Sequence, residues 1–178
     1  MRIIGGKYRG KKLQSPADSA VRPTLDRVRE TLFNILQFRV PECRFLDLFA
    51  GSGAIGIEAY SRGAREVVFV EKQKEHVRLL RNNLASVRAE CLVLQEDAIL
   101  ACKHLQGSFD LIYLDPPYES GLYLSALRAV VENGRLAEGG TVVCERLTAQ
   151  PPSYEVPWHC RDSRKIGTVT LDFLEQIK

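Results

Sequence analysis

The feature that most constrains the fold is a regular alternation, from residue 44 onward, of short apolar runs with segments of helical spacing. The apolar runs predict strands over Arg44–Leu48, Glu66–Val70, Cys91–Gln95, Asp110–Leu114 and Thr141–Glu145. Helices are predicted between them, over 53–62, 75–86, 98–104 and 122–132. Strands and helices that take turns in this way form an α/β fold, with a mostly parallel sheet covered on both faces.

The two ends of the chain depart from this alternation. Two strand-like runs, Trp158–Lys165 and Thr168–Leu174, are joined by a short turn, so we expect the sheet to end in an antiparallel hairpin. Before the first strand, Thr24 is predicted to cap a helix over Leu25–Leu36, whose apolar residues follow helical spacing. No linker divides the chain, so we expect one domain.

The composition is that of a folded protein with its own core. The chain has 178 residues, of which 45% are apolar and 26% are charged. No apolar stretch is long enough to span a bilayer, and the N-terminus lacks the apolar core of a signal peptide. The cysteines are odd in number and have no CxxC spacing, which predicts free, buried thiols and no metal site. We therefore expect a cytoplasmic protein, and a monomer for lack of any interface pattern.

Charge is unevenly distributed along the chain. Residues 1–29 contain eight basic and two acidic side chains (+6), whereas the remainder contains 17 basic and 20 acidic ones (−3). Apolar residues and glycines intersperse the basic residues of 1–13, which predicts a basic β-hairpin rather than a structureless tail. Such a surface suits a polyanion. The residues expected to contact nucleic acid are Arg2, Lys7, Arg9, Lys11 and Lys12.

A glycine-rich turn follows the first predicted strand. Gly51, Gly53 and Gly56 form a GxGxxG pattern between a strand and a helix, where a tight turn lets a ligand approach the backbone. Glu71 ends the next strand, 20 residues after Gly51, where an acid can hold ribose hydroxyls. These residues fit a dinucleotide and S-adenosylmethionine equally well.

Asp47 favours S-adenosylmethionine over a dinucleotide. Its carboxylate lies just before the glycine turn, where it would repel a pyrophosphate. S-adenosylmethionine carries a positive ammonium and a positive sulfonium instead, and a nearby carboxylate suits both. Asp97, after the third strand, can accept a hydrogen bond from an adenine amine, cap the next helix, or do both.

The fourth strand ends in Asp115-Pro116-Pro117-Tyr118. Two prolines cannot continue a ladder, so they fix a rigid turn after the strand. Asp115 and a proline carbonyl can then accept hydrogen bonds from one amino group, and the ring of Tyr118 offers a surface for a base. This arrangement suits a planar exocyclic amine.

These four residues match the catalytic motif of S-adenosylmethionine-dependent amino methyltransferases, which act on exocyclic nitrogens of bases. The whole chain resembles the bacterial family of 16S rRNA guanine-N2 methyltransferases. The blocks that carry this resemblance are Arg2-Ile3-Ile4-Gly5-Gly6, Arg9-Gly10-Lys11-Lys12-Leu13, Arg22-Pro23-Thr24, Asp26-Arg27-Val28-Arg29-Glu30-Thr31-Leu32-Phe33-Asn34 and Asp47-Leu48-Phe49-Ala50-Gly51-Ser52-Gly53. Some relatives have Phe where this chain has Tyr118, and either ring can stack on a base.

The resemblance implies a Rossmann-like class I methyltransferase fold of seven strands, with the last strand antiparallel. It implies that residues 1–24 form an RNA-contacting extension and 25–178 the catalytic core. The implied catalytic residues are Asp115, Pro116, Pro117 and Tyr118. The implied S-adenosylmethionine site comprises Arg22, Pro23, Thr24, Asp47, Phe49, Ala50, Gly51, Ser52, Gly53, Glu71, Lys72, Asp97, Ala98 and Asp115.

The reaction that the resemblance implies is direct methyl transfer to N2 of one guanine, flipped out of 16S rRNA in a small-subunit particle. Three alternatives stay open. A DNA adenine-N6 methyltransferase would use the same motif, but few residues remain for a target-recognition domain. The GxGxxG pattern alone would suit an NAD-dependent oxidoreductase, and the same fold could serve as a non-catalytic RNA-binding subunit.

Overall fold

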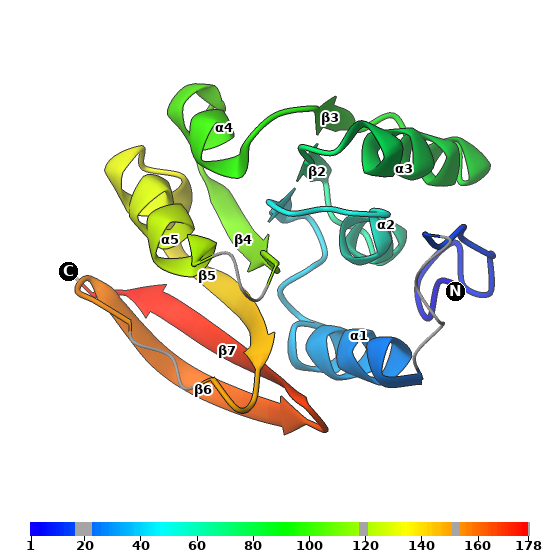
Figure 1. The fold of residues 1–178 in the computed structure, drawn as a ribbon. Helices are drawn as coiled ribbons and strands as arrows, with labels where there is room; N and C mark the ends of the chain where they lie inside the picture. The colour runs from blue at the N-terminus through cyan, green and yellow to red at the C-terminus, as the bar shows by residue number, and fades with distance from the viewer. Residues whose placement is uncertain (17–22, 118–120, 151–153, 178) are drawn as a thin grey trace.

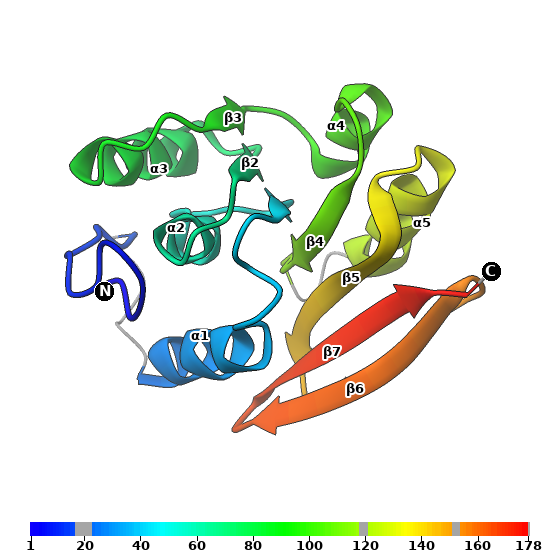
Figure 2. The same cartoon turned by 180° about the vertical axis from the view of Figure 1, so that it is seen from behind.

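The computed structural model describes residues 1–16, 23–117, 121–150 and 154–177. A seven-stranded sheet of order β3-β2-β1-β4-β5-β7-β6 crosses the molecule (Figures 1 and 2). The strands are β1 (Arg44–Asp47), β2 (Glu66–Val70), β3 (Leu92–Leu94), β4 (Phe109–Leu114), β5 (Leu136–Leu147), β6 (Trp158–Ile166) and β7 (Val169–Gln176). β1 to β5 pair in parallel, and β7 runs antiparallel to both of its neighbours. The predicted sheet with an antiparallel last strand is therefore confirmed.

Helices cover both faces of the sheet, as the alternation predicts. They are α1 (Pro23–Ile35), α2 (Ala54–Ser61), α3 (Lys74–Ser86), α4 (Ala98–His104) and α5 (Leu122–Glu132). One hydrophobic cluster joins α1, α2 and α3 to the sheet, and a second joins α4 and α5 to its other face. Successive residues of β1 illustrate the division, because Phe45 belongs to the first cluster and Leu46 to the second.

Several predicted boundaries differ from the structure by one or two residues, and two differences need a physical explanation. Helix α1 begins at Pro23, so Thr24 lies inside the helix and the prediction that it caps the helix is wrong. Proline suits a first helical position because its fixed φ is helical and its missing N–H has no partner there anyway. β5 begins at Leu136 rather than Thr141, because Leu136 pairs with Phe109 ahead of an irregularity in the ladder. Within the described ranges, no helix combines the length and apolar composition that crossing a bilayer requires.

The N-terminal segment, residues 1–14, folds back on itself without forming the predicted two-stranded hairpin. A single antiparallel bridge joins Arg2 to Lys12. Further backbone hydrogen bonds, such as Ile3 N–H to the Lys11 carbonyl (3.0 Å), close the loop. The ladder does not extend because the N–H groups of Ile4 and Gly5 turn toward α2 instead, where they donate to the buried carboxylate of Glu58 (2.8 and 2.7 Å).

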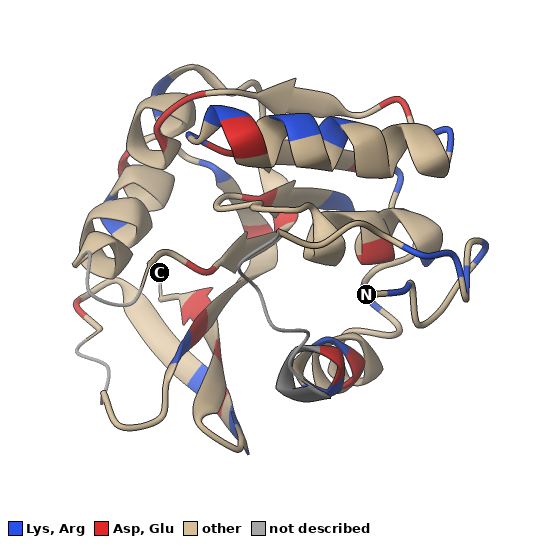
Figure 3. Ribbon diagram, turned by 45° about the vertical axis from the view of Figure 1, so that its right-hand side comes forward, with Lys and Arg blue, Asp and Glu red and all other residues tan. Residues whose placement is uncertain are grey.

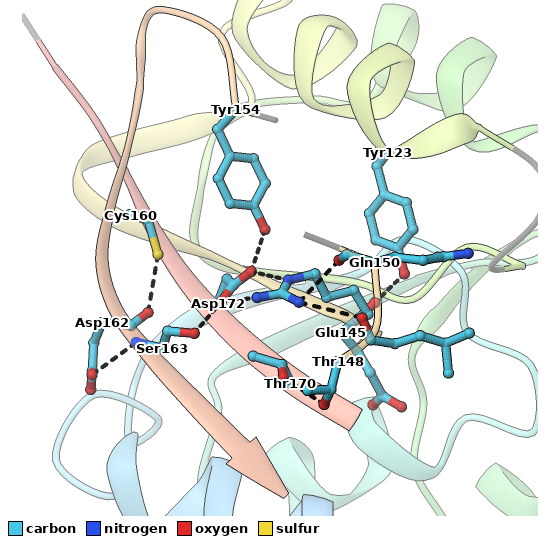
Figure 4. Close-up of polar contacts among 12 residues, drawn as sticks. Tyr123, Glu145, Thr148, Gln150, Tyr154, Cys160, Asp162, Ser163, Thr170 and Asp172 are labelled. Atoms are coloured by element: carbon cyan, nitrogen blue, oxygen red, sulfur yellow. Dashed lines mark hydrogen bonds and ion pairs between the residues drawn. The ribbon is translucent and has the colours of Figure 1, made fainter. Parts of the chain in front are cut away.

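The last two strands are held by a buried carboxylate in β7. Asp172 is 1% exposed and accepts hydrogen bonds from Arg146 Nε (2.5 Å), Tyr154 Oη (2.7 Å) and Ser163 Oγ (2.5 Å) (Figure 4). Burial alone would raise the pKa of Asp172, but these hydrogen bonds outweigh it and lower the pKa. The contacts tie β5, β6 and the segment before β6 to β7, which fixes the end of β5 next to the candidate site.

All five cysteines are free, as predicted. Cys43, Cys102 and Cys144 are buried, whereas Cys91 and Cys160 are partly exposed. Burial raises the pKa of the Cys102 thiol to about 11, so this side chain behaves as a small apolar residue.

Candidate functional site

Two adjoining cavities lie beyond the carboxyl ends of the parallel strands, where open α/β sheets bind ligands. The larger has a volume of about 400 Å³ and the smaller about 180 Å³. They share Phe49, Gly51 and Asp115, so they lie next to each other. The predicted cofactor residues in the larger cavity are Phe49, Gly51, Glu71, Lys72, Asp97, Ala98 and Asp115, and those in the smaller are Asp47, Phe49, Ala50, Gly51, Ser52 and Asp115.

The glycine-rich turn links β1 to α2, and its Gly51 borders both cavities. Gly51 and Gly53 have φ values of +52° and +80°, which favour glycine. A Cβ on Gly53 would also come within 2.1 Å of Leu80 Cδ1, and one on Gly56 within 2.2 Å of the Phe69 ring. Gly53 and Gly56 therefore serve the packing of α2 and α3 on the sheet, while Gly51 lies at the cavity wall.

Asp47 ends β1 with its side chain in the smaller cavity. It is 1% exposed, and its Oδ2 accepts a hydrogen bond from the Gly56 N–H in the first turn of α2 (3.0 Å). Burial raises the pKa of Asp47 to about 7, the Gly56 N–H lowers it, and the nearby Glu71 raises it. The carboxylate thus takes one N–H that a phosphate at this helix end would use, and it adds negative charge.

Glu71 connects the ends of β1 and β2. Its Oε2 accepts from the Gly51 N–H and its Oε1 from the Gln73 N–H, both at 2.8 Å. The side chain lies at the wall of the larger cavity. Because each carboxylate oxygen has two lone pairs, Glu71 can shape the loop and still accept from a ribose hydroxyl.

Asp97 caps α4, one of the roles that the sequence left open. Its Oδ1 accepts from the Ile99 N–H (3.0 Å) and the Leu100 N–H (3.4 Å). Its Oδ2 lies 3.4 Å from Lys72 Nζ at the wall of the larger cavity. The oxygen that does not cap the helix can therefore face a ligand.

The motif after β4 lies where the two cavities meet. Asp115 borders both, while Pro116, which is buried, and Pro117 border the larger one. Burial of its carboxyl raises the pKa of Asp115 well above its usual range, and the neighbouring Glu145 and Asp47 add to the effect. Tyr118 and Arg22 lie outside the described residues, as do the side chains of Pro23 and Thr24 at the start of α1.

The structure adds functional candidates that the sequence analysis missed. Glu145, 3% exposed and on β5, borders the smaller cavity and accepts a hydrogen bond from the Tyr113 hydroxyl. Arg29, 3% exposed and on α1, borders the same cavity. The sequence signal that could have identified them is a charged residue within an otherwise apolar segment. Such a residue is seldom buried without a partner, so it indicates a polar contact inside the fold. Among the residues that the structure describes, no group of three or more His, Cys, Asp or Glu is arranged to hold a metal ion.

The basic residues of the N-terminal segment are displayed on its surface. Arg2, Lys7, Arg9, Lys11 and Lys12 are all exposed. In Figure 3 the ribbon of this segment is blue at its Lys and Arg positions. The segment contacts the site directly at Met1, which borders the smaller cavity.

The N-terminal segment is also tied to the glycine-rich turn through Asn83 of α3. Asn83 is 1% exposed; its Oδ1 accepts from the Gln14 N–H (2.8 Å), and its Nδ2 donates to the carbonyls of Gln14 (3.1 Å) and Ser52 (2.9 Å). The N-terminal segment and the glycine-rich turn are therefore held together by one buried side chain.

Comparisons with known proteins agree with this geometry. Residues 1–175 match the family described as "Conserved hypothetical protein 95". The chain is 38% identical over 171 residues to ribosomal RNA small subunit methyltransferase D of Escherichia coli strain K12, covering 95% of this chain and 86% of the relative. It is 34% identical to the Haemophilus influenzae protein of the same name, covering 96% and 91%. The solved structure of the Escherichia coli protein yhhF superposes with a TM-score of 0.88 at 31% identity, covering 100% of this chain and 98% of that one.

Proposed function

Because this chain belongs to the bacterial family of ribosomal RNA small subunit methyltransferase D, we propose that it methylates the exocyclic N2 of one guanine in 16S rRNA. It has the class I methyltransferase fold, and S-adenosylmethionine is the methyl donor. The observation that carries the proposal is the position of Asp115-Pro116-Pro117, at the junction of two cavities beyond β4. An amine held there lies beside the cofactor site.

The residues that line the cavities fit S-adenosylmethionine. Glu71 and Asp97 in the larger cavity offer acceptors for ribose hydroxyls and an adenine amine, and Asp47 in the smaller suits the positive methionine end. The Asp47–Gly56 hydrogen bond disfavours a phosphate there, which argues against a dinucleotide. When bound, the cofactor supplies an electrophilic methyl group on its sulfonium.

In this proposal, the residues of the motif after β4 bind and orient the nucleophile, the exocyclic amine of guanine. Guanine N2 is a weak nucleophile because its lone pair is delocalised into the ring. Asp115 Oδ and the Pro116 carbonyl accept hydrogen bonds from the amine and favour a more pyramidal nitrogen. Tyr118 stacks on the base and offsets part of the cost of flipping it. Positioning of this kind contributes up to roughly 7–11 kcal/mol in well-oriented systems.

Residues 1–24 form the RNA-contacting extension in this proposal, and residues 25–178 form the catalytic core. The exposed basic side chains of the segment would bind backbone phosphates of the rRNA. The substrate is 16S rRNA within a small-subunit particle, and the enzyme acts as a cytoplasmic monomer.

The direct test is methyl transfer from labelled S-adenosylmethionine to undermethylated 30S particles, naked 16S rRNA and duplex DNA, followed by nucleoside analysis. N2-methylguanosine from 30S particles is the expected product. N6-methyladenine from DNA would overturn the substrate while keeping the cofactor. Cofactor binding without transfer to any of these substrates would favour a non-catalytic RNA-binding role.

Asp115→Asn tests the catalytic assignment. The variant keeps the shape of the side chain but replaces one acceptor oxygen with a donor, so kcat should fall by about 100-fold or more, as when one transition-state hydrogen bond is lost elsewhere. Cofactor affinity, measured by titration calorimetry, should change little. Activity near the wild-type level with weakened cofactor binding would show that Asp115 belongs to the cofactor site alone.

A further inference from the structure

The smaller cavity contains charged groups of both signs. Its acidic residues are Asp47, Asp115 and Glu145, and its basic side chain is Arg29. The first two residues of α2, Ala54 and Ile55, also line it. A ligand that fills this space therefore meets negative and positive groups within about 180 Å³.

Arg29 is bound through only one of its three nitrogens. Its Nη2 donates to the Arg2 carbonyl (2.7 Å) and to Asp26 Oδ1 (2.8 Å). Its Nε and Nη1 are buried and have no hydrogen-bond partner among the described residues. Buried polar atoms are nearly always partnered, and a charged donor without a partner is especially costly. These donors therefore call for an acceptor from a ligand.

Arginine is the side chain that keeps its charge in such a place. Burial lowers the pKa of Arg29, and the neighbouring Asp26 and Glu58 counteract it. The guanidinium nevertheless remains protonated, because arginine is the most strongly basic of the side chains. A carboxylate would match the planar pair of N–H donors that Nε and Nη1 present.

The N-terminus of α2 adds a second, independent group of donors to the same wall. The helix begins after Gly53, which is in the left-handed region and provides no side-chain cap. The first N–H groups of a helix have no partner inside it and carry partial positive charge. The N–H group of Gly56 donates to Asp47. Ala54 and Ile55, the two residues that begin the helix, line the cavity.

We propose that Arg29, together with the first turn of α2, binds the α-carboxylate of the methionine part of S-adenosylmethionine. The inference rests on the cofactor assignment of the proposed function. A group with a carboxylate and an ammonium on one carbon matches a cavity that holds a guanidinium and helix donors together with the carboxylate of Asp47. A phosphate carries no positive charge and would meet that carboxylate unfavourably.

Three ligands separate the contributions of the cofactor's parts. They are S-adenosylmethionine, decarboxylated S-adenosylmethionine, which lacks only the carboxylate, and 5′-methylthioadenosine, which lacks the amino acid part. Titration calorimetry should show that the wild-type protein binds the decarboxylated compound roughly 10- to 100-fold more weakly than the intact cofactor. The ratio of the two dissociation constants, decarboxylated over intact, should fall to about 1–3 in Arg29→Met. In Arg29→Lys it should take an intermediate value, because lysine keeps the charge but not the planar donors.

Asp26→Asn is the matched control, since it removes an ion-pair partner of Arg29 but keeps the guanidinium. Its ratio should equal that of the wild type, and 5′-methylthioadenosine should bind all folded variants alike. A wild-type ratio in both Arg29→Met and Arg29→Lys would overturn the inference, as would a ratio near one in the wild-type protein. If Arg29→Met does not fold, the affinity ratio of Arg29→Lys alone tests the inference, and a wild-type ratio in that variant overturns it.

The outcome is separable from that of the proposed function. Cofactor discrimination through Arg29 without methyl transfer to rRNA would refute the substrate assignment and leave this inference standing. Failure of the wild-type protein to bind any of the three ligands would refute the cofactor assignment, and the inference with it.

Discussion

At the scale of single residues, Asp47 shows how position decides the behaviour of a carboxylate. Its side chain is almost fully buried, and desolvation raises its pKa to about 7. At that value the group titrates near neutral pH, unlike an exposed aspartate. A cation bound beside it favours the ionised form, so binding of the cofactor and loss of this proton are linked.

The linkage predicts a pH dependence of cofactor affinity. Below about pH 7 the bound cation must displace the proton from Asp47, so affinity should rise as pH rises through this value. Titration calorimetry from about pH 6 to about pH 7.5 should show a several-fold increase, and Asp47→Asn should bind more weakly with a flatter profile. A wild-type profile that is flat over this range would contradict the raised pKa.

Glu145 and Arg29 are two buried charged residues of the candidate site that the sequence alone did not identify. Both lie in segments that the sequence predicts correctly as a strand and a helix, yet neither was assigned to the site. Each was missed because its role depends on groups from other elements: Tyr113 and Asp115 beside Glu145, and the first turn of α2 beside Arg29. A charged residue within each segment is a local signal of a buried, partnered side chain, but nothing within β5 or α1 identifies the partners.

At the scale of the elements, the cap of α4 has a structural role and a proposed role in cofactor binding. Asp97 uses Oδ1 to satisfy N–H groups at the start of the helix, and its Oδ2 lies toward Lys72 at the larger cavity. The two roles are compatible because they use different oxygens.

Two substitutions separate these roles. Asp97→Asn keeps an oxygen that can cap α4, so unfolding free energy should stay close to that of the wild type, whereas cofactor affinity should fall because one acceptor becomes a donor. Asp97→Ala should lose both the helix cap and the acceptor for the cofactor, and the lost cap should lower the free energy of unfolding by about 1 kcal/mol. Denaturant unfolding and calorimetric titration measure the two effects. Unchanged cofactor affinity in Asp97→Asn would show that this residue only caps the helix.

The N-terminal segment and the last two strands show how tertiary contacts determine an element. The glycines and basic residues of 1–13 predict a hairpin, but Glu58 and Ser61 of α2 take N–H groups that a second strand would need. In β6 and β7, by contrast, local alternation and the cross-strand partners of Asp172 agree, and the predicted hairpin forms (Figure 4).

At the scale of the whole molecule, the basic N-terminal segment and the acidic residues of the candidate site occupy different regions. Five exposed basic residues lie on the N-terminal segment, where the ribbon is blue in Figure 3. The cavities beyond the sheet are lined by several carboxylates. A polyanion is thus attracted to one part of the surface and a cationic cofactor to another, with Asn83 and Glu58 packing the two parts together.

Neutralising Lys7, Arg9, Lys11 and Lys12 together with Gln should weaken rRNA binding and flatten its salt dependence. Each lost phosphate contact should reduce the slope of log affinity against log salt by about 0.7, so the combined change should approach about 3. Binding measured across a salt series tests this. Lys103→Gln with Arg128→Gln, on α4 and α5, is the control and should keep the slope. If the N-terminal variant also keeps it, the basic segment is a solvated surface.

The sequence by itself determined the order of strands and helices, the glycine turn, the motif after β4 and the family, because each is a local pattern or a string of neighbouring residues. It could not reveal that residues 29, 47, 115 and 145 meet in one cavity, nor that the N-terminal segment docks on Glu58. Those contacts join residues far apart in the chain. They exist because the parallel strands bring their carboxyl ends to one edge, where burial then sets which charges are partnered and how they titrate.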